Sequence, residues 1–226
     1  MSSIRNKTKY LAVSILIGGR STRFGSDKGL FEYLGKPLIS HQLDTLSNLN
    51  HDIFLVANSK EQVQNYIDRI DIKYITGFII DENNVLPDFK SHTPMIGLYS
   101  ASKELKNLAY EKTLVIACDT PLIKYDVLEL LIKQSIGYDC CIPQWNNNFV
   151  EPLFATYSIK KLLRKVKENF KENNLKLSNL LDKSWKINYL SIENVIKPID
   201  KKLLTFFNIN TSKDIEKLIN IQGDKT

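Results

Sequence analysis

The stretch Leu-Ile-Gly-Gly-Arg-Ser-Thr-Arg-Phe-Gly-Ser-Asp-Lys, residues 16–28, decides the fold that the sequence predicts. It follows the apolar run Tyr10–Ile17, whose length and β-branched residues are typical of a buried strand. Four of the nine glycines of the chain lie in the stretch or directly after it: Gly18, Gly19, Gly25 and Gly29. Glycine lets the backbone take positive φ and approach a ligand closely. The stretch is therefore either a ligand-binding loop or a flexible, solvated turn.

Three cations in the same loop favour the first interpretation. Arg20, Arg23 and Lys28 add side-chain donors to the backbone amides, and this combination suits a polyphosphate. The loop lacks the Gly-Lys-Ser/Thr sequence of a P-loop and the spaced glycines of the dinucleotide fingerprint.

Length and composition favour a globular α/β domain. With 226 residues, 43% of them apolar, one domain spanning 1–226 is favoured over two smaller ones, with a polar, basic tail over about residues 1–9. The net charge of +6 is spread along the chain, which favours anionic small molecules as ligands at least as much as nucleic acid. Basic motifs interleaved with aromatic residues are absent from the sequence, so nucleic acid is not expected as a partner.

The cysteines and the apolar runs argue against several further classes of protein. The three cysteines contain no Cys-x-x-Cys pair, which argues against a structural zinc site or a disulfide framework. No apolar run has the length of a membrane span, and the N-terminus has no signal-peptide pattern. We therefore expect a cytoplasmic protein that does not bind membranes.

Strands and helices are predicted to alternate. Further buried strands are expected at 53–57, 78–81 and 114–119, with helices around 39–46, 63–70, 94–108 and 127–131. This alternation predicts a Rossmann-like, three-layer α/β/α fold with a mostly parallel sheet. In the second half we expect strands at 139–143, 150–157 and 185–189, a long helix at 159–170, a shorter one near 178–181, and a terminal helix capped by Thr211.

Two predicted strands end in a carboxylate. Asp81 and Asp119 follow strands whose carboxyl ends lie at the edge where ligands bind in such sheets. Asp119, before Thr120 and Pro121, is well placed to hold a magnesium ion on nucleotide phosphates, although aspartate also caps turns. Glu151 is either a substrate-site group or a strand-edge charge, and His41 is expected to be packed or hydrogen-bonded rather than catalytic.

Five ordered motifs resemble the molybdenum cofactor guanylyltransferases, a family of the nucleotidyltransferase superfamily with a glycosyltransferase-A type fold. The first motif is the loop at 16–28 with Gly-Lys-Pro-Leu at 35–38. The others are Thr-Pro-Met-Ile-Gly at 93–97, Cys-Asp-Thr-Pro at 118–121, Glu-Pro-Leu-Phe-Ala at 151–155 and Phe-Asn-Ile-Asn-Thr at 207–211. The resemblance covers most of the chain.

The resemblance implies transfer of GMP from magnesium-bound GTP to the terminal phosphate of molybdopterin, with release of pyrophosphate. Arg23, Lys28 and Asp119 are then the catalytic residues, and Asp119 is also the Mg²⁺ ligand. The nucleotide is expected against Leu16, Ile17, Gly18, Gly19, Lys28, Asp81 and Asp119, and the substrate near Pro94, Gly97, Glu151, Asn208 and Asn210. No protein nucleophile is needed, because the pterin phosphate attacks directly and catalysis rests on positioning and charge stabilisation. Contact with other cofactor-biosynthesis proteins or molybdoenzymes is a further expectation.

Several positions depart from the family pattern. Ile17 replaces a small alanine, Phe24 a methionine and Thr93 a glycine, and Val56 stands where the family has a base-contacting asparagine, with Asn58 two residues away. A relative that uses CTP or a sugar-phosphate acceptor therefore stays an alternative, although Gly19 after Gly18 favours GTP. A nucleotide-binding protein without catalysis is a second alternative, against which Arg23, Lys28 and Asp119 argue together.

Overall fold

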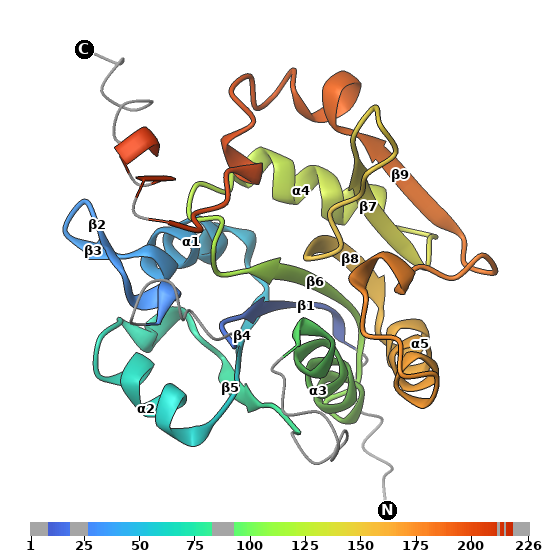
Figure 1. Ribbon diagram of the computed structural model, residues 1–226, viewed down its shortest axis with the longest axis horizontal. Coiled ribbons are helices and arrows are strands. Elements are labelled where there is room, and N and C mark those ends of the chain that lie inside the picture. Colours follow the sequence, from blue (N-terminus) through green and yellow to red (C-terminus); the bar gives the residue numbers. More distant parts are fainter. Residues whose placement is uncertain (1–8, 19–26, 83–92, 212, 215, 219–226) are drawn as a thin grey trace, which may run out of the picture.

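A mostly parallel sheet forms the centre of the protein. A computed structural model describes residues 9–18, 27–82, 93–211, 213, 214 and 216–218. In this part of the chain seven strands form one sheet in the order β5–β4–β1–β6–β8–β7–β9 (Figure 1). In that order their bounds are Gly77–Ile80, Asp52–Ala57, Lys9–Leu16, Tyr110–Ala117, Phe154–Ser158, Cys140–Gln144 and Ile187–Ser191. Only β8 runs antiparallel to its neighbours in this sheet, so the predicted sheet type is confirmed.

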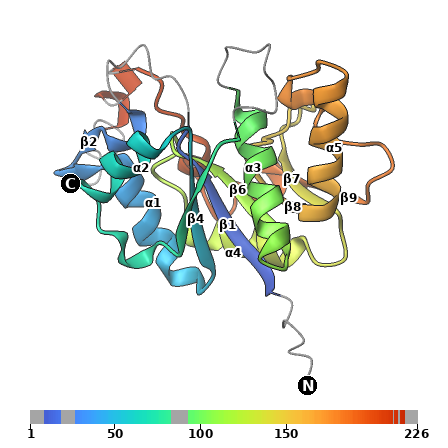
Figure 2. The same cartoon turned by 90° about the horizontal axis from the view of Figure 1, so that it is seen from below.

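Helices cover both faces of the sheet, which confirms the three-layer prediction (Figure 2). The helices α1 (Leu38–Leu46), α2 (Lys60–Ile67) and α4 (Tyr125–Gln134) contribute to the core on one face. On the other face the core is built with α3 (Pro94–Asn107) and α5 (Ile159–Lys171). Among the described residues, none of the helices has the length and apolar character needed to cross a membrane.

The central strand β1 shows why the sequence gives two cores. Leu11, Val13 and Ile15 belong to the core under α1, α2 and α4, whereas Ala12 and Leu16 belong to the core under α3 and α5. Successive strand residues point to opposite faces, so a strand covered on both sides must be apolar almost throughout. This requirement accounts for the apolar run, interrupted only by Ser14, that precedes the glycine-rich loop.

The carboxyl ends of the four parallel strands lie level at one edge. Leu16 of β1 is paired with Val56 of β4 and Ala117 of β6, and Ala57 is paired with Ile80 of β5. The segments that follow these strands therefore meet at this edge, as expected for a parallel sheet.

The returning strand β8 is shorter than the sequence predicts. It begins at Phe154 rather than Val150, and Val150 forms only an isolated bridge with Gln144. Pro152 has no amide to donate to a ladder, and the amide of Phe154 donates to the carbonyl of Glu151 at 3.0 Å. Glu151 and Pro152 therefore form a turn before the strand.

A short hairpin precedes α1, and the sequence analysis did not predict it. The strands β2 (Glu32–Tyr33) and β3 (Lys36–Pro37) pair antiparallel across Leu34 and Gly35, whose φ angles are 48° and 78°. Two central residues with positive φ are typical of a tight hairpin turn. Pro37 belongs to this hairpin and stands before the first residue of α1 rather than in its first turn.

Other boundaries differ by a few residues. The predicted helix near 178–181 is a single 3₁₀ turn at Leu177–Asn179, and α2 ends at Ile67 rather than near Ile70, which still packs in the core. Trp185 precedes β9 and is buried against α3 and α5, so the strand itself starts at Ile187.

A buried hydrogen bond between β1 and β6 gives a test of the sheet. The hydroxyls of Ser14 and Thr113 are 2.8 Å apart and both side chains are fully buried. Ser14→Ala leaves the Thr113 hydroxyl buried without this partner, so we expect the free energy of unfolding to fall by about 1–3 kcal/mol in urea denaturation. Adding Thr113→Val removes the second hydroxyl and should recover part of the loss. A double variant no more stable than Ser14→Ala would contradict this account.

Candidate active site

The chain bends where β1 ends. The amides of Ile17 and Gly18 both donate to the carbonyl of Val56, at 3.0 and 3.1 Å. A Cβ atom on Gly18 would lie 3.3 Å from Oδ2 of Asp81 and 3.5 Å from the amide nitrogen of Asn58. Glycine at this position therefore keeps the space beside the Asp81 carboxylate open.

A small cavity of about 60 Å³ lies at this bend. Its lining residues come from the ends of three strands and the start of α3: Leu16, Gly18, Val56, Asp81, Thr93, Pro94 and Gly97. A Cβ atom on Gly97 would lie 3.3 Å from Cδ2 of Leu16 and 3.6 Å from Oδ1 of Asp81. Two glycines thus flank the carboxylate, and the structure brings Leu16, Gly18, Asp81, Pro94 and Gly97 together.

Asp81 is a buried carboxylate in this cavity. Its Oδ1 atom is inaccessible to solvent and makes no hydrogen bond within the described part of the protein. Burial raises the pKa of Asp81 to about 7. A carboxyl group with an unused oxygen at a cavity wall is a hydrogen-bond acceptor for a ligand.

Ile17 occupies a different position from its neighbours. Its side chain is buried in the core under α1 and α2, its amide donates to Val56, and its carbonyl accepts from Nε2 of Gln62 at 2.9 Å. Ile17 therefore does not line the cavity. Asn58, by contrast, lies next to Gly18, which brings an asparagine near the cavity although Val56 holds the aligned position.

Lys28 joins three segments that are far apart in the sequence. Its Nζ atom lies 3.3 Å from Oδ2 of Asp119 and 2.8 Å from Oδ1 of Asn210. The backbone carbonyl of Asp119 accepts from the amide of Ile209 at 2.8 Å, which fixes the segment around Asn210 beside Asp119. Oδ1 of Asp119 is buried and makes no hydrogen bond within the described residues.

Asp27 holds the backbone at Lys28. Its Oδ1 accepts from the amide of Gly29 at 3.1 Å and from the hydroxyl of Tyr66 at 2.6 Å, while its Oδ2 accepts from Nε2 of Gln62. Because Gln62 also bonds the carbonyl of Ile17, this network ties the end of the glycine-rich loop to the end of β1. Burial raises the pKa of Tyr66 well above its ordinary value, and the Asp27 charge adds to this effect. The phenol therefore remains a donor.

The sequence analysis missed Gln62 and Tyr66 as supports of the site. They stand four residues apart on α2, so they share one helix face, and both side chains are buried. A buried glutamine on an otherwise apolar face is the one signal in the sequence that indicates such a network.

Of the remaining predicted site residues, the structure describes Glu151 and Asn208 but not Gly19 and Arg23. Glu151 is half-buried, and its Oε1 accepts from Nε1 of Trp145 at 2.7 Å. Asn208 is exposed two residues before Asn210, with the buried Ile209 between them. Gly19 and Arg23 lie outside the described residues.

Other reactive side chains are engaged or buried. Nε2 of His41 lies 2.8 Å from the carbonyl of Tyr33, as expected for a hydrogen-bonded histidine. The three cysteines are free and buried. In the described part of the chain, no three His, Cys, Asp or Glu side chains gather into a metal centre of their own. A cation here would therefore depend on one or two carboxylates together with ligand oxygens.

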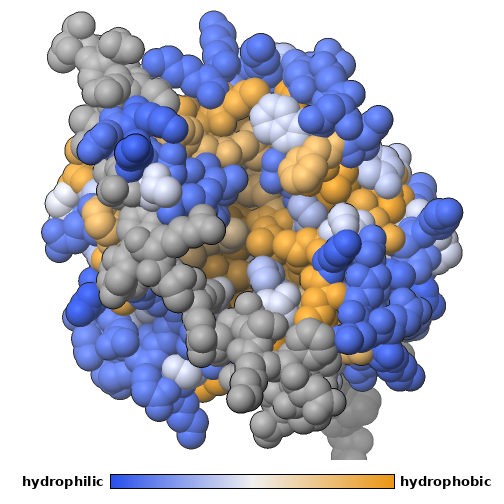
Figure 3. Space-filling model, viewed as in Figure 1, coloured by the Kyte–Doolittle hydropathy of each residue, from blue (hydrophilic) through white to orange (hydrophobic). Residues whose placement is uncertain are grey.

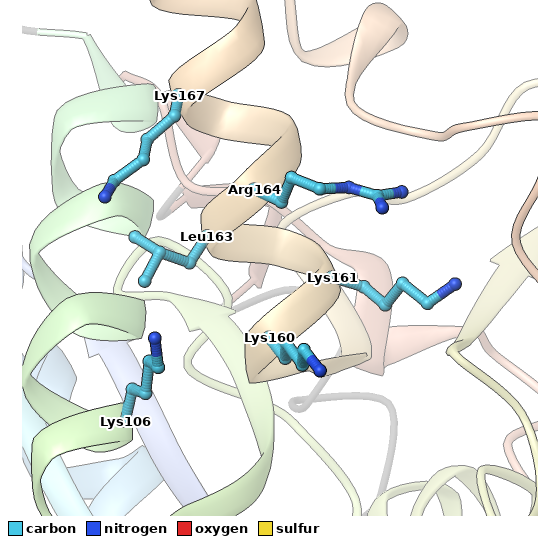
Figure 4. A pocket seen from close by; sticks show the side chains of 6 residues that line it. All are labelled: Lys106, Lys160, Lys161, Leu163, Arg164 and Lys167. Carbon is cyan, nitrogen blue, oxygen red and sulfur yellow. The ribbon is translucent and has the colours of Figure 1, made fainter.

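A second cavity, of about 530 Å³, lies between α3 and α5. Figure 4 shows its lining, which is basic apart from one leucine: Lys106, Lys160, Lys161, Leu163, Arg164 and Lys167. Lys106 stands at the end of α3 opposite Pro94, so this groove is remote from Asp81. Figure 3 shows a different feature, a hollow with an apolar surface in the region where Figure 1 draws β1 and β6.

Comparisons with known proteins agree with this geometry. A family model described as the MobA-like NTP transferase domain matches residues 13–183. A probable molybdenum cofactor guanylyltransferase from Pyrococcus horikoshii is 31% identical over 209 residues, covering 91% of this chain and 97% of that protein. One from Thermococcus gammatolerans is 32% identical over 212 residues, covering 91% and 97%. The crystal structure of molybdopterin-guanine dinucleotide biosynthesis protein A from Archaeoglobus fulgidus matches with a TM-score of 0.74 and 26% identity, covering 94% and 99%.

The family model and the relatives define the class of the enzyme, which is a nucleotidyltransferase. The chain belongs to the MobA-like NTP transferase family. The resemblance seen in the sequence is thereby confirmed.

The raised pKa of Asp81 predicts a pH dependence of stability. Its folded pKa of about 7 lies above the ordinary 3.8, so the folded protein keeps a proton between these values that the unfolded chain has lost. The stabilisation from this proton is full below pH 3.8 and is lost as the pH rises through about 7. We expect the free energy of unfolding of the wild type, relative to Asp81→Asn, to decline across this window and then level off. If the free energy of unfolding from urea denaturation changes with pH in the same way in the wild type and in Asp81→Asn, the raised pKa of Asp81 is contradicted.

Proposed function

We propose that this nucleotidyltransferase transfers GMP from magnesium-bound GTP to the terminal phosphate of molybdopterin and releases pyrophosphate. The names of its relatives support the reaction. The observation that carries the choice of nucleotide is the Asp81 carboxylate, which has an unused buried oxygen between Gly18 and Gly97.

A carboxylate in this cavity suits guanine. The Watson–Crick edge of guanine presents two adjacent donors, N1–H and the 2-amino group, and a carboxylate can accept from both. Adenine and cytosine present a single amino donor on that edge, next to acceptors that a carboxylate repels. The glycines on both sides leave room for the flat base to approach Asp81. The cavity therefore favours GTP over the alternative nucleotide, CTP. Asp81 must be ionised to accept hydrogen bonds from both donors of guanine.

Lys28, Asp119 and Asn210 suit the phosphate side of the reaction. The Asp119 carboxylate fits a magnesium ion, because Oδ1 is buried without a hydrogen-bond partner among the described residues and carboxylate oxygens are preferred ligands of this ion. When bound, magnesium supplies charge neutralisation of the triphosphate. Nζ of Lys28 lies 3.3 Å from Oδ2 of the same aspartate and would stabilise the negative charge on the leaving pyrophosphate.

The chemistry needs no protein nucleophile. An oxygen of the pterin phosphate attacks the α-phosphorus of GTP, a new P–O bond forms, and the bond to the β-phosphate oxygen breaks. Asn208 and Asn210 would lie toward the acceptor, since they flank Ile209, whose amide donates to the carbonyl of Asp119. A catalytically inactive nucleotide-binding protein is disfavoured, because Lys28 and Asp119 meet at 3.3 Å.

Nucleotide choice tests the role of Asp81. We expect purified protein with Mg²⁺ and molybdopterin to consume GTP in preference to CTP, ATP and inosine triphosphate, which lacks the 2-amino group. Asp81→Asn should weaken the use of GTP by about 10- to 100-fold and narrow the preference for GTP over inosine triphosphate. Measured rates of pyrophosphate release give the comparison. Preference of the wild type for CTP would overturn the proposed substrate.

Replacing Lys28 or Asp119 with alanine tests whether these charged side chains act on the triphosphate. Lys28→Ala and Asp119→Ala should each lower pyrophosphate release by about 10²- to 10³-fold while the circular dichroism spectrum stays that of the wild type. Lys36→Ala is the matched control, because Lys36 forms a surface ion pair with Asp44. Unchanged turnover in both site variants is incompatible with the mechanism.

A further inference from the structure

The buried side-chain amide of Gln62 joins three segments that meet at the site. Its Oε1 atom accepts from the backbone amide of Asn58 at 2.8 Å, and its Nε2 atom donates to the carbonyl of Ile17 at 2.9 Å and to Oδ2 of Asp27. Asn58 directly follows β4, and Ile17 directly follows β1. Asp27 directly precedes Lys28 at the end of the glycine-rich loop. One amide group therefore fixes this end of the loop against the ends of two strands.

The three partners of Gln62 require an amide at this position. A backbone N–H only donates, so the side-chain oxygen must face Asn58. A carbonyl and a carboxylate only accept, so the side-chain nitrogen must face Ile17 and Asp27. A glutamate carboxylate could not donate to the carbonyl of Ile17 and would stand against a second carboxylate, whereas a lysine could not accept from Asn58. Methionine, of similar length, would satisfy none of the three.

The other oxygen of Asp27 is held from the same helix. Oδ1 of Asp27 accepts from the hydroxyl of Tyr66 at 2.6 Å and from the amide of Gly29 at 3.1 Å. A Cβ atom at residue 29 would overlap the Tyr66 hydroxyl, so this contact requires glycine there. Lys28 stands between the residue that carries the carboxylate and the residue whose amide it accepts from. The backbone of Lys28 is therefore fixed on both sides by one carboxylate, which Gln62 and Tyr66 hold.

Gln62 also links this carboxylate to the small cavity at Asp81. Gly18 lines the cavity and directly follows Ile17, whose carbonyl accepts from Gln62. A displacement of about 1 Å between groups that act on one substrate can lower a rate by about 100-fold. A side chain that fixes the backbone of Lys28 relative to Gly18 can therefore change the rate without contacting the substrate.

We propose that Gln62 is a positioning residue for nucleotidyl transfer, which acts through Asp27 to set the place of Lys28 relative to the cavity. The inference rests on the proposed function, in which Lys28 stabilises the charge on the leaving pyrophosphate. Gln62 is buried and both hydrogens of its side-chain nitrogen are engaged, so it acts on the reaction through its neighbours. Tyr66 contributes in the same way, by holding the other oxygen of Asp27.

A double-mutant cycle on pyrophosphate release tests whether Gln62 acts through Lys28. With Mg²⁺, GTP and molybdopterin, we expect Gln62→Met to lower the rate by about 10- to 100-fold. In a protein that already carries Lys28→Ala, the same change should cost less than about threefold, because the group that it displaces is gone. Gln64→Met is the matched control, since Gln64 is an exposed glutamine on the same helix. Wild-type turnover in Gln62→Met, or equal losses in both backgrounds, overturns the proposal.

A milder variant covers the case in which Gln62→Met does not fold. Tyr66→Phe removes one hydroxyl from Asp27 and keeps the contacts of Gln62. We expect a loss of about fivefold in pyrophosphate release, which disappears in the Lys28→Ala background. Circular dichroism and urea denaturation establish that each variant is folded at the assay temperature. A loss of the same size with and without Lys28 contradicts the positioning role.

Nucleotide binding separates this proposal from the proposed reaction. Affinities for GTP and GMP with Mg²⁺ are measured by calorimetry, and their ratio isolates the outer phosphates from any effect on the cavity. If the wild type releases no pyrophosphate, Gln62→Met should still narrow the preference for GTP by about tenfold, and only where Lys28 is present. That result supports the role of Gln62 and contradicts only the proposed reaction. An unchanged preference, or equal narrowing with Lys28→Ala, overturns the role of Gln62 itself.

Discussion

The contacts of Asp119 tie together the parts of the molecule on which the site depends. Its carboxylate meets Lys28 from the end of the glycine-rich loop, and its backbone carbonyl holds Ile209 near the end of the chain. Lys28 and Asn210 are 182 residues apart, yet they share a hydrogen bond of 2.8 Å through this arrangement. Asp119 can do this because it lies two residues after β6, a central and mostly buried strand that pairs with β1 and β8 and so fixes the position of the turn that follows it.

The cavity at Asp81 depends on a different feature, the absence of side chains at two glycines. Gly18 follows β1 and Gly97 belongs to α3, and a Cβ atom at either position would lie within 3.6 Å of an Asp81 oxygen. The protein thus keeps a buried carboxylate at the wall of a small cavity. The raised pKa of Asp81 follows from the same enclosure, since the wall that shapes the cavity also excludes water.

The fold was predictable because its main elements have strong local patterns. The strand that ends at Leu16 is mostly apolar, and β6 and α3 are equally clear from their apolar residues. The hairpin at Leu34 and Gly35 was not predictable, because its strands have two residues each and leucine seldom takes positive φ. The proximity of Asp81 and Asp119 to one edge followed from the topology. The hydrogen bond from Tyr66 to Asp27 could not be predicted, because side-chain contacts between distant segments leave no periodic signal in one sequence.

The ion pair of Lys28 and Asp119 has a thermodynamic consequence for ligand binding. In the proposed function, a divalent cation at Asp119 would be repelled by the ammonium group that lies 3.3 Å from the same carboxylate. Phosphate oxygens would offer that ammonium group another partner and would also ligate the cation. Metal and nucleotide would therefore each favour the binding of the other, and by linkage the coupling would be equal in both directions.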